Sequence, residues 1–154
     1  ACHGLGRIYL VTEASIVQSN FKGALLRGAS FAGVDGRNTI FAEADLGGAD
    51  CRGGHFDQSL WVGAALEAVN FSDAHLPLSV FHRARCAGAD FQRAALQDAD
   101  FSNADLTGAN LNGAQFLRTR FHRALQQGAR FSGRGGIIEN EPELHKGQAW
   151  SDSH

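Results

Sequence analysis

The chain has 154 residues, a net charge of −2 at pH 7 and 44% hydrophobic residues. This length fits one domain, and the balanced charge gives no reason to expect nucleic acid or an anionic membrane as a partner. No apolar run is long enough to span a membrane. The chain contains no Met, so we expect it to be processed or part of a longer polypeptide.

Residues 1–13 precede the patterned part of the chain. The run Arg-Ile-Tyr-Leu-Val at positions 7–11 predicts a short strand, which would cap the first layer of the patterned part. An open sheet edge invites pairing with other chains, so a cap is expected at each end.

Residues 14–133 form an uninterrupted five-residue repeat. All 11 Phe fall in one register, and from Ile16 to Phe131 every fifth residue is a repeat centre, most often Phe or Leu. The residue two positions before the centre is usually Ala. Gly recurs two positions after the centre, from Gly23 to Gly133, and Asp or Asn recurs just before it, as at Asp100.

A period of five fits neither a helix nor a strand. The small residue and the centre point inward, and the residue between them, here called the outward position, points out. The two residues after the centre, the first and second turn residues, must turn the chain before the next inward pair. Gly suits the second turn position, and an Asp or Asn side chain at the outward position can cap the turn.

Units such as Ala-Asp-Phe-Ser-Asn at 99–103 and Ala-Asp-Leu-Thr-Gly at 104–108 resemble the repeating unit of pentapeptide-repeat proteins. The resemblance covers residues 14–133. It implies an all-β fold, a right-handed quadrilateral β-helix with four repeats per coil and about six coils, with short capping segments at 1–13 and 134–154.

Sorting the centres by 20 residues tests the four-sided coil. One inward column then contains six aromatic residues in succession: Phe21, Phe41, Trp61, Phe81, Phe101 and Phe121. Two centres depart from the pattern. We expect Gly36 to leave a gap under Phe56 or to bend the chain, and we expect the polar Gln126, in the last coil, to reach water.

The segment 134–154 lies beyond the repeat. It carries scattered apolar residues, among them Ile137, Ile138 and Trp150, which we expect to fold back over the last coil as a C-terminal cap.

Chemistry-bearing motifs are absent from the sequence. There is no nucleophile elbow, phosphate loop or paired-Cys metal spacing, and the inward positions are filled, so we expect no enzyme and no cofactor. Asp35, His55 and His75 share one outward column and could in principle hold Zn²⁺, but we favour a solvated polar ladder and predict no metal site.

Two further expectations concern single residues. The three cysteines, Cys2, Cys51 and Cys86, are expected to be reduced, two of them as small hydrophobic centres. Arg85 and Asp105 share an outward column one coil apart, so a weak surface ion pair between them is expected.

One group of outward positions departs from the polar pattern. Ile40, Leu60 and Val80 follow one another in one outward column, and Val62 lies beside them. These four residues, here called the apolar strip, are the predicted protein-binding site, because a contiguous exposed apolar surface often marks an interaction. Coverage by another segment of the chain, or a plain preference of β-branched residues for strands, would explain them equally.

The leading functional prediction is a non-catalytic protein-protein interaction module or structural spacer within a larger assembly. The family resemblance implies an alternative, a DNA mimic that binds DNA gyrase or topoisomerase IV and confers resistance to quinolones or toxins. Such mimicry needs an acidic surface, whereas residues 14–133 contain 11 Lys or Arg against 11 Asp or Glu. Self-association stays open. The compartment we expect is the bacterial cytoplasm, with a plastid lumen or secretion as alternatives.

Overall fold

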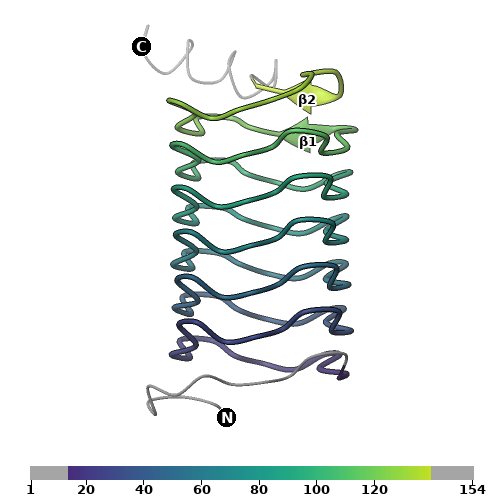
Figure 1. Cartoon of the computed structure of the whole chain (residues 1–154), viewed down its shortest axis with the longest axis vertical. Helices are drawn as coiled ribbons and strands as arrows, with labels where there is room; N and C mark the ends of the chain where they lie inside the picture. Colours follow the sequence, from purple (N-terminus) through teal and green to yellow (C-terminus); the bar gives the residue numbers. More distant parts are fainter. Residues whose placement is uncertain (1–13, 140–154) are drawn as a thin grey trace, which may run out of the picture.

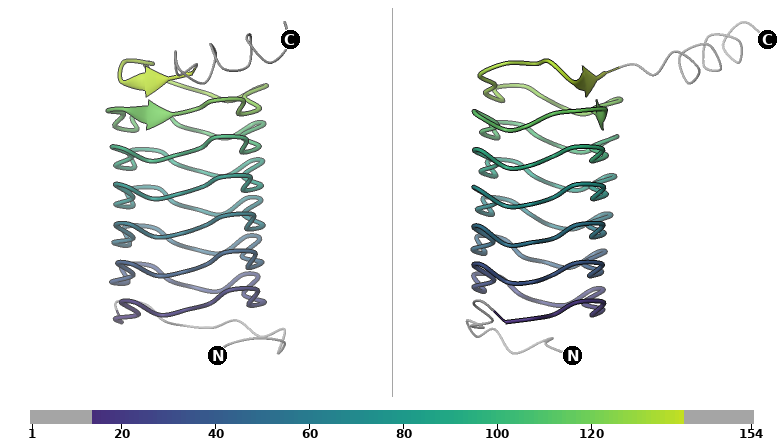
Figure 2. Two further views of the ribbon diagram at one scale, coloured as in Figure 1. Left: turned by 180° about the vertical axis from the view of Figure 1, so that it is seen from behind. Right: turned by 90° about the vertical axis from the view of Figure 1, so that its right-hand side faces the viewer.

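The structure is a computed structural model that describes residues 14–139. Coils of similar size stack along a single axis (Figure 1), and the stack is straight from every side (Figure 2). Every fifth residue from Ser15 to Asn110 forms a parallel bridge with the residue 20 positions later. One coil therefore contains four repeats, as the sequence predicts, while the right-handedness of the coil stays a prediction.

Turns every five residues keep the bridged segments short. Within residues 14–139 only two segments reach strand length, β1 (Thr119–Arg120) and β2 (Ile137–Ile138), and they pair in parallel. Thr119 lies opposite Ile137, 18 residues later instead of 20. The ladder thus continues past residue 133, and Ile137 packs against the core. The domain boundaries stay predictions, since residues 1–13 and 140–154 lie outside the described part.

The same backbone hydrogen bonds recur in each repeat. At the third coil, the Trp61 amide donates to the Val80 carbonyl at 2.7 Å, and the Leu60 amide donates to Thr39 at 3.0 Å. The turn is closed by the Ala64 amide, which donates to the Trp61 carbonyl at 3.1 Å. These bonds leave little freedom in where the outward side chains lie.

Each turn requires a left-handed residue. Every second turn residue from 18 to 128 has a positive φ, whether it is Gly or not. Ala68 and Leu78, for example, both have φ of 59°, a conformation that costs most residues other than Gly about 1–2 kcal/mol. Gly133, predicted to serve the same turn, is not among the residues with positive φ, because the regular repeat ends there.

Aromatic rings fill the interior. The predicted aromatic column is confirmed: Phe41 stacks on Trp61 with centroids 4.3 Å apart, and Phe81 stacks on Phe101 at 4.7 Å. Neighbouring columns meet edge to face, as Phe71 does with Phe81 at 5.8 Å. These geometries suit the quadrupoles of the rings and leave no interior space for a substrate beside them.

A buried hydroxyl satisfies the indole of Trp61. The Trp61 Nε1–H donates to Ser59 Oγ at 2.6 Å, and the Ser59 hydroxyl donates to the Phe56 carbonyl at 2.6 Å. Both side chains are fully buried. Ser79, one coil later, makes the equivalent bond to the Leu76 carbonyl at 2.6 Å.

The expected gap at Gly36 is absent. A Cβ at Gly36 would lie 2.7 Å from Phe56 Cδ1, and a Cβ at Gly54 would lie 2.4 Å from Phe56 Cε2. The ring of Phe56 therefore occupies the space that two missing side chains leave, and the prediction of a cavity was wrong. The two glycines and the ring form one packing unit.

Gln126 is half-buried and held by polar partners. Its Nε2 donates to Glu139 Oε1 at 3.2 Å, and Arg134 donates to its Oε1 at 2.9 Å. Arg134 also pairs with Glu139 and lies over the Phe131 ring at 4.2 Å. The polar centre thus joins a small network over the last coil, where we had expected contact with water.

We predict that Ser59→Ala destabilises the chain by about 1–3 kcal/mol, because the buried Trp61 Nε1–H loses its acceptor. Urea unfolding followed by Trp fluorescence measures the change. Ser79→Ala is the matched control, since its hydroxyl accepts no indole bond, and it should cost clearly less. Equal losses for the two variants would contradict the role given to the indole bond.

We predict that Gly36→Ala costs about 1–3 kcal/mol through the clash with Phe56. In a Phe56→Leu background this cost should shrink by about 1 kcal/mol or more, because the ring atoms that clash are gone. Gly88→Ala, whose Cβ would meet nothing within 4 Å, should cost the same in both backgrounds. Additive losses at Gly36 and Phe56 would disprove the packing unit.

We predict that Ala68→Gly stabilises the chain by about 0.5–1 kcal/mol, because relief of left-handed strain exceeds the greater entropy of Gly in the unfolded state. Leu78→Gly should act in the same direction. Ala87→Gly, at a first turn position without positive φ, should destabilise. The midpoints of thermal and urea unfolding test all three variants.

Candidate docking surface

The structure places three members of the apolar strip on one ladder. Leu60 bridges Ile40 on one side and Val80 on the other. Leu60 is 37% exposed, and Ile40 and Val80 are half-buried. The predicted column is therefore present on the outside of the rod, while its role in binding stays a prediction.

Val62 lies on the same face, in the column of first turn residues. It is half-buried, and its carbonyl accepts the Glu43 amide at 2.9 Å. Trp61, between Leu60 and Val62 in the chain, points inward and is fully buried. The strip thus forms the outer surface over the middle of the aromatic column.

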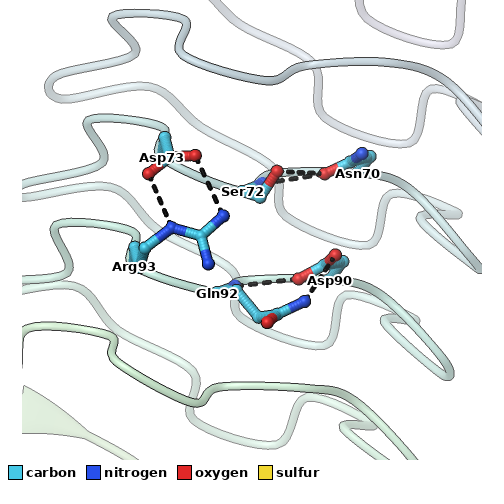
Figure 3. A network of polar contacts seen from close by, with 6 residues as sticks. All are labelled: Asn70, Ser72, Asp73, Asp90, Gln92 and Arg93. Carbon is cyan, nitrogen blue, oxygen red and sulfur yellow. Dashed lines mark hydrogen bonds and ion pairs between the residues drawn. The ribbon is translucent and has the colours of Figure 1, made fainter.

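Polar outward positions elsewhere contribute to the turns. Asn70 accepts the Ser72 amide at 2.9 Å, and Asp90 accepts the Gln92 amide at 2.9 Å (Figure 3). All seven capping positions that the sequence suggests make this bond: Asp45, Asp50, Asn70, Asp90, Asp100, Asp105 and Asn110.

Apolar side chains in the strip cannot make this bond. Each such position forgoes a contribution of about 0.5–1.5 kcal/mol, typical of one hydrogen bond. The strip is therefore not explained by the local needs of the turns.

Sequence reasoning missed one apolar neighbour. Leu78 is 52% exposed and is the second turn residue immediately before the strand segment that contains Val80. Its φ of 59° is unfavourable for a Leu. A bulky apolar residue at a position that suits Gly or Asn was the available signal, and it was not used.

Charged side chains on the other faces pair with one another. Arg93 donates to both carboxylate oxygens of Asp73, at 2.9 and 3.2 Å (Figure 3). Hydrogen bonds from Arg93 hold the pKa of Asp73 below its usual value. Arg118 binds Asp98 in the same way, one coil apart. These pairs are exposed and contribute little to stability, but they neutralise the surface locally.

The expected pair of Arg85 and Asp105 does not form. Arg85 Nε lies 3.7 Å from Glu67 Oε1, and Asp105 instead accepts the amide and hydroxyl of Thr107. The turn cap that Asp105 makes orients its carboxylate along its own chain segment, which is the physical reason for the difference.

Asp35, His55 and His75 do share a ladder, and the two imidazole rings lie 4.6 Å apart. The Asp35 carboxylate, however, accepts two bonds from Arg37, both at 2.8 Å. These bonds hold the pKa of Asp35 below its usual value. In residues 14–139, no group of three His, Cys, Asp or Glu could hold a metal ion.

Cys51 and Cys86 are free and fully buried. Burial raises the pKa of both thiols, so they remain protonated and act as small hydrophobic centres. Cys2 lies outside the described residues. No helix in the described part of the chain is long and apolar enough to cross a membrane.

Solved structures with a similar arrangement are pentapeptide-repeat proteins. QnrB1, a plasmid-mediated fluoroquinolone resistance protein, shares 12% identity over 95% of this chain and 98% of its own, with a TM-score of 0.33. HetL from Nostoc sp. strain PCC 7120 shares 19% identity over 84% of each chain, with a TM-score of 0.32. A protein from the Arabidopsis thaliana thylakoid lumen shares 25% identity over 68% of this chain and 66% of its own, with a TM-score of 0.31.

These likenesses are too distant to carry a function. The comparison with curated protein sequences gave no match. Two family descriptions do match: "Pentapeptide repeats (8 copies)" over residues 19–58 and "Pentapeptide repeat region" over residues 54–131. Together they cover most of the ladder, and the chain belongs to the pentapeptide-repeat family.

Proposed function

We propose that this chain is a non-catalytic protein-protein interaction module, or a spacer within a larger assembly, that docks through the apolar strip. The observation that carries the proposal is the ladder from Ile40 through Leu60 to Val80, apolar on the outside of a coil whose other outward residues are mostly polar. Leu78 extends this surface at the adjacent corner.

Rigidity makes the surface suitable for docking. The outward side chains are held by a backbone that is hydrogen-bonded to the coils before and after it, so little conformational entropy is lost on binding. Apolar side chains near the centre of an interface often carry much of the binding energy when they become fully buried. A partner with a complementary apolar face would gain from burial without first ordering this chain.

The DNA-mimic alternative receives no support from the surface charges. Carboxylates on the outward positions pair with nearby guanidinium groups, as Asp50 does with Arg52 at 2.8 Å and Asp35 does with Arg37. An acidic surface suited to a basic DNA groove would need these carboxylates unneutralised. The fluoroquinolone resistance named for QnrB1 is accordingly not carried over to this chain.

We predict that affinity capture from native cell extract recovers a protein partner with the wild type and loses it with an Ile40→Asp/Leu60→Asp/Val80→Asp variant. Three buried charges at an apolar contact should weaken binding by a factor of about 30 or more. Recovery should tolerate high salt, because apolar contacts are not screened.

The matched control is a His55→Asp/His75→Asp/Ala95→Asp variant, which adds three carboxylates at outward positions of another face. It should retain the partner. Leu78→Gly should weaken capture while raising stability, and Ala68→Gly should raise stability alone. Equal capture by both triple variants would refute the proposed site, and salt-sensitive recovery of a topoisomerase would favour the DNA mimic.

A further inference from the structure

We propose that the apolar strip binds a second copy of this chain, lying antiparallel on the same face with Leu60 of both copies at the two-fold axis. This inference rests on the proposed function, since it names the partner of the same surface. It is carried by the order of the side chains along three neighbouring columns.

The symmetry follows from the straight rod (Figures 1 and 2). A two-fold axis that lies in the interface and crosses the rod reverses the order of the coils. It also keeps each column over its own equivalent in the second copy, as in an isologous interface. With Leu60 on the axis, the coil of Ile40 meets the coil of Val80, each about 4.8 Å from the axis.

The apolar residues then match. Ile40 meets Val80 of the second copy, Leu60 meets Leu60, and in the next column Val62 meets Val62. Leu78, at the corner beside Val80, comes next to Ile40 of the second copy. Each apolar member of the surface therefore acquires an apolar neighbour, and the partly exposed Leu60 becomes central.

The charges match around the same axis. The column of second turn residues places Glu43 one coil before the axis and Arg83 one coil after it, with Gly63 between them. The two-fold axis sets Glu43 against Arg83 of the second copy, twice. Both side chains are exposed, and neither forms an ion pair within residues 14–139.

Charges two coils from the axis agree with the same arrangement. Lys22, in the first coil, lies across from the fifth coil of the second copy, where Asp100 occupies the neighbouring column. Lys22 forms no ion pair within the described chain. Gly63, at the centre of the corner column, meets Gly63 and leaves room there for the longer side chains of Glu43 and Arg83.

Other arrangements of two copies do not match. An axis on the second coil sets Glu43 against Glu43, and an axis on the fourth coil sets Leu60 against Asp100. A parallel dimer, with its axis along the rod, exchanges the columns and sets Glu43 against Ile40. The agreement of apolar and charged positions is specific to the third coil and to the antiparallel order.

Sedimentation equilibrium of the purified full chain tests the inference. The wild type should show twice the mass of the chain, and Leu60→Asp should show the single mass while far-UV circular dichroism confirms that it is folded. Glu43→Arg alone, or Arg83→Glu alone, should raise the dimer dissociation constant about tenfold or more, because each creates two like-charge contacts.

Mixing is the decisive measurement. Equal amounts of the Glu43→Arg and Arg83→Glu variants should form a heterodimer as tight as the wild-type dimer, since every contact at this corner is again attractive. Arg85→Glu, with the same change in net charge and in the same coil but on another face, should leave the dimer unchanged.

The outcomes separate this inference from the proposed function. A wild type that stays monomeric overturns the second copy as partner, yet a different protein captured by the wild type and lost from the strip variant would still support docking. A dimer that ignores Leu60→Asp overturns both. A dimer that is lost with Leu60→Asp but not restored by mixing overturns the antiparallel arrangement.

Discussion

The structure depends on one constraint: the chain must turn after every five residues and meet itself 20 residues later. The turn demands a left-handed residue at each second turn position, including positions occupied by Ala68 and Leu78. In return, the amide and carbonyl of each outward residue bond to the coils on either side. Because the backbone hydrogen bonds connect one coil to the next, stability is shared among nearest-neighbour coils, as in other solenoids.

This constraint explains why the sequence predicts so much of the fold. A strict period places Phe41, Trp61 and Phe81 in one column whatever their rotamers, and the rings stack as expected. It also places Ile40, Leu60 and Val80 on one ladder. Positions that depend only on counting residues are accessible to sequence reasoning, since no insertion disturbs the register between Ile16 and Phe131.

Features that counting could not predict depend on side-chain conformation. Phe56 fills the space at Gly36 because its ring turns toward Gly36 and Gly54, which the order of the columns does not reveal. Arg85 pairs with Glu67 instead of Asp105 because Asp105 is engaged by its own turn. The shift of β2 by two residues arises beyond Phe131, where the period no longer applies.

The apolar strip is best understood by comparison with the other faces. Those faces fold with Asp, Asn, Arg or His at outward positions, so the coil itself does not require Ile40, Leu60 and Val80 to be apolar. Leu78 adds exposed apolar surface at a position where its backbone is also strained. Four departures that each disfavour the isolated chain meet on one surface, over a core that is regular beneath them. A cost borne at one place by the folded chain is accounted for by a contact outside that chain, and the unpaired Glu43 and Arg83 on the same surface give that contact its direction.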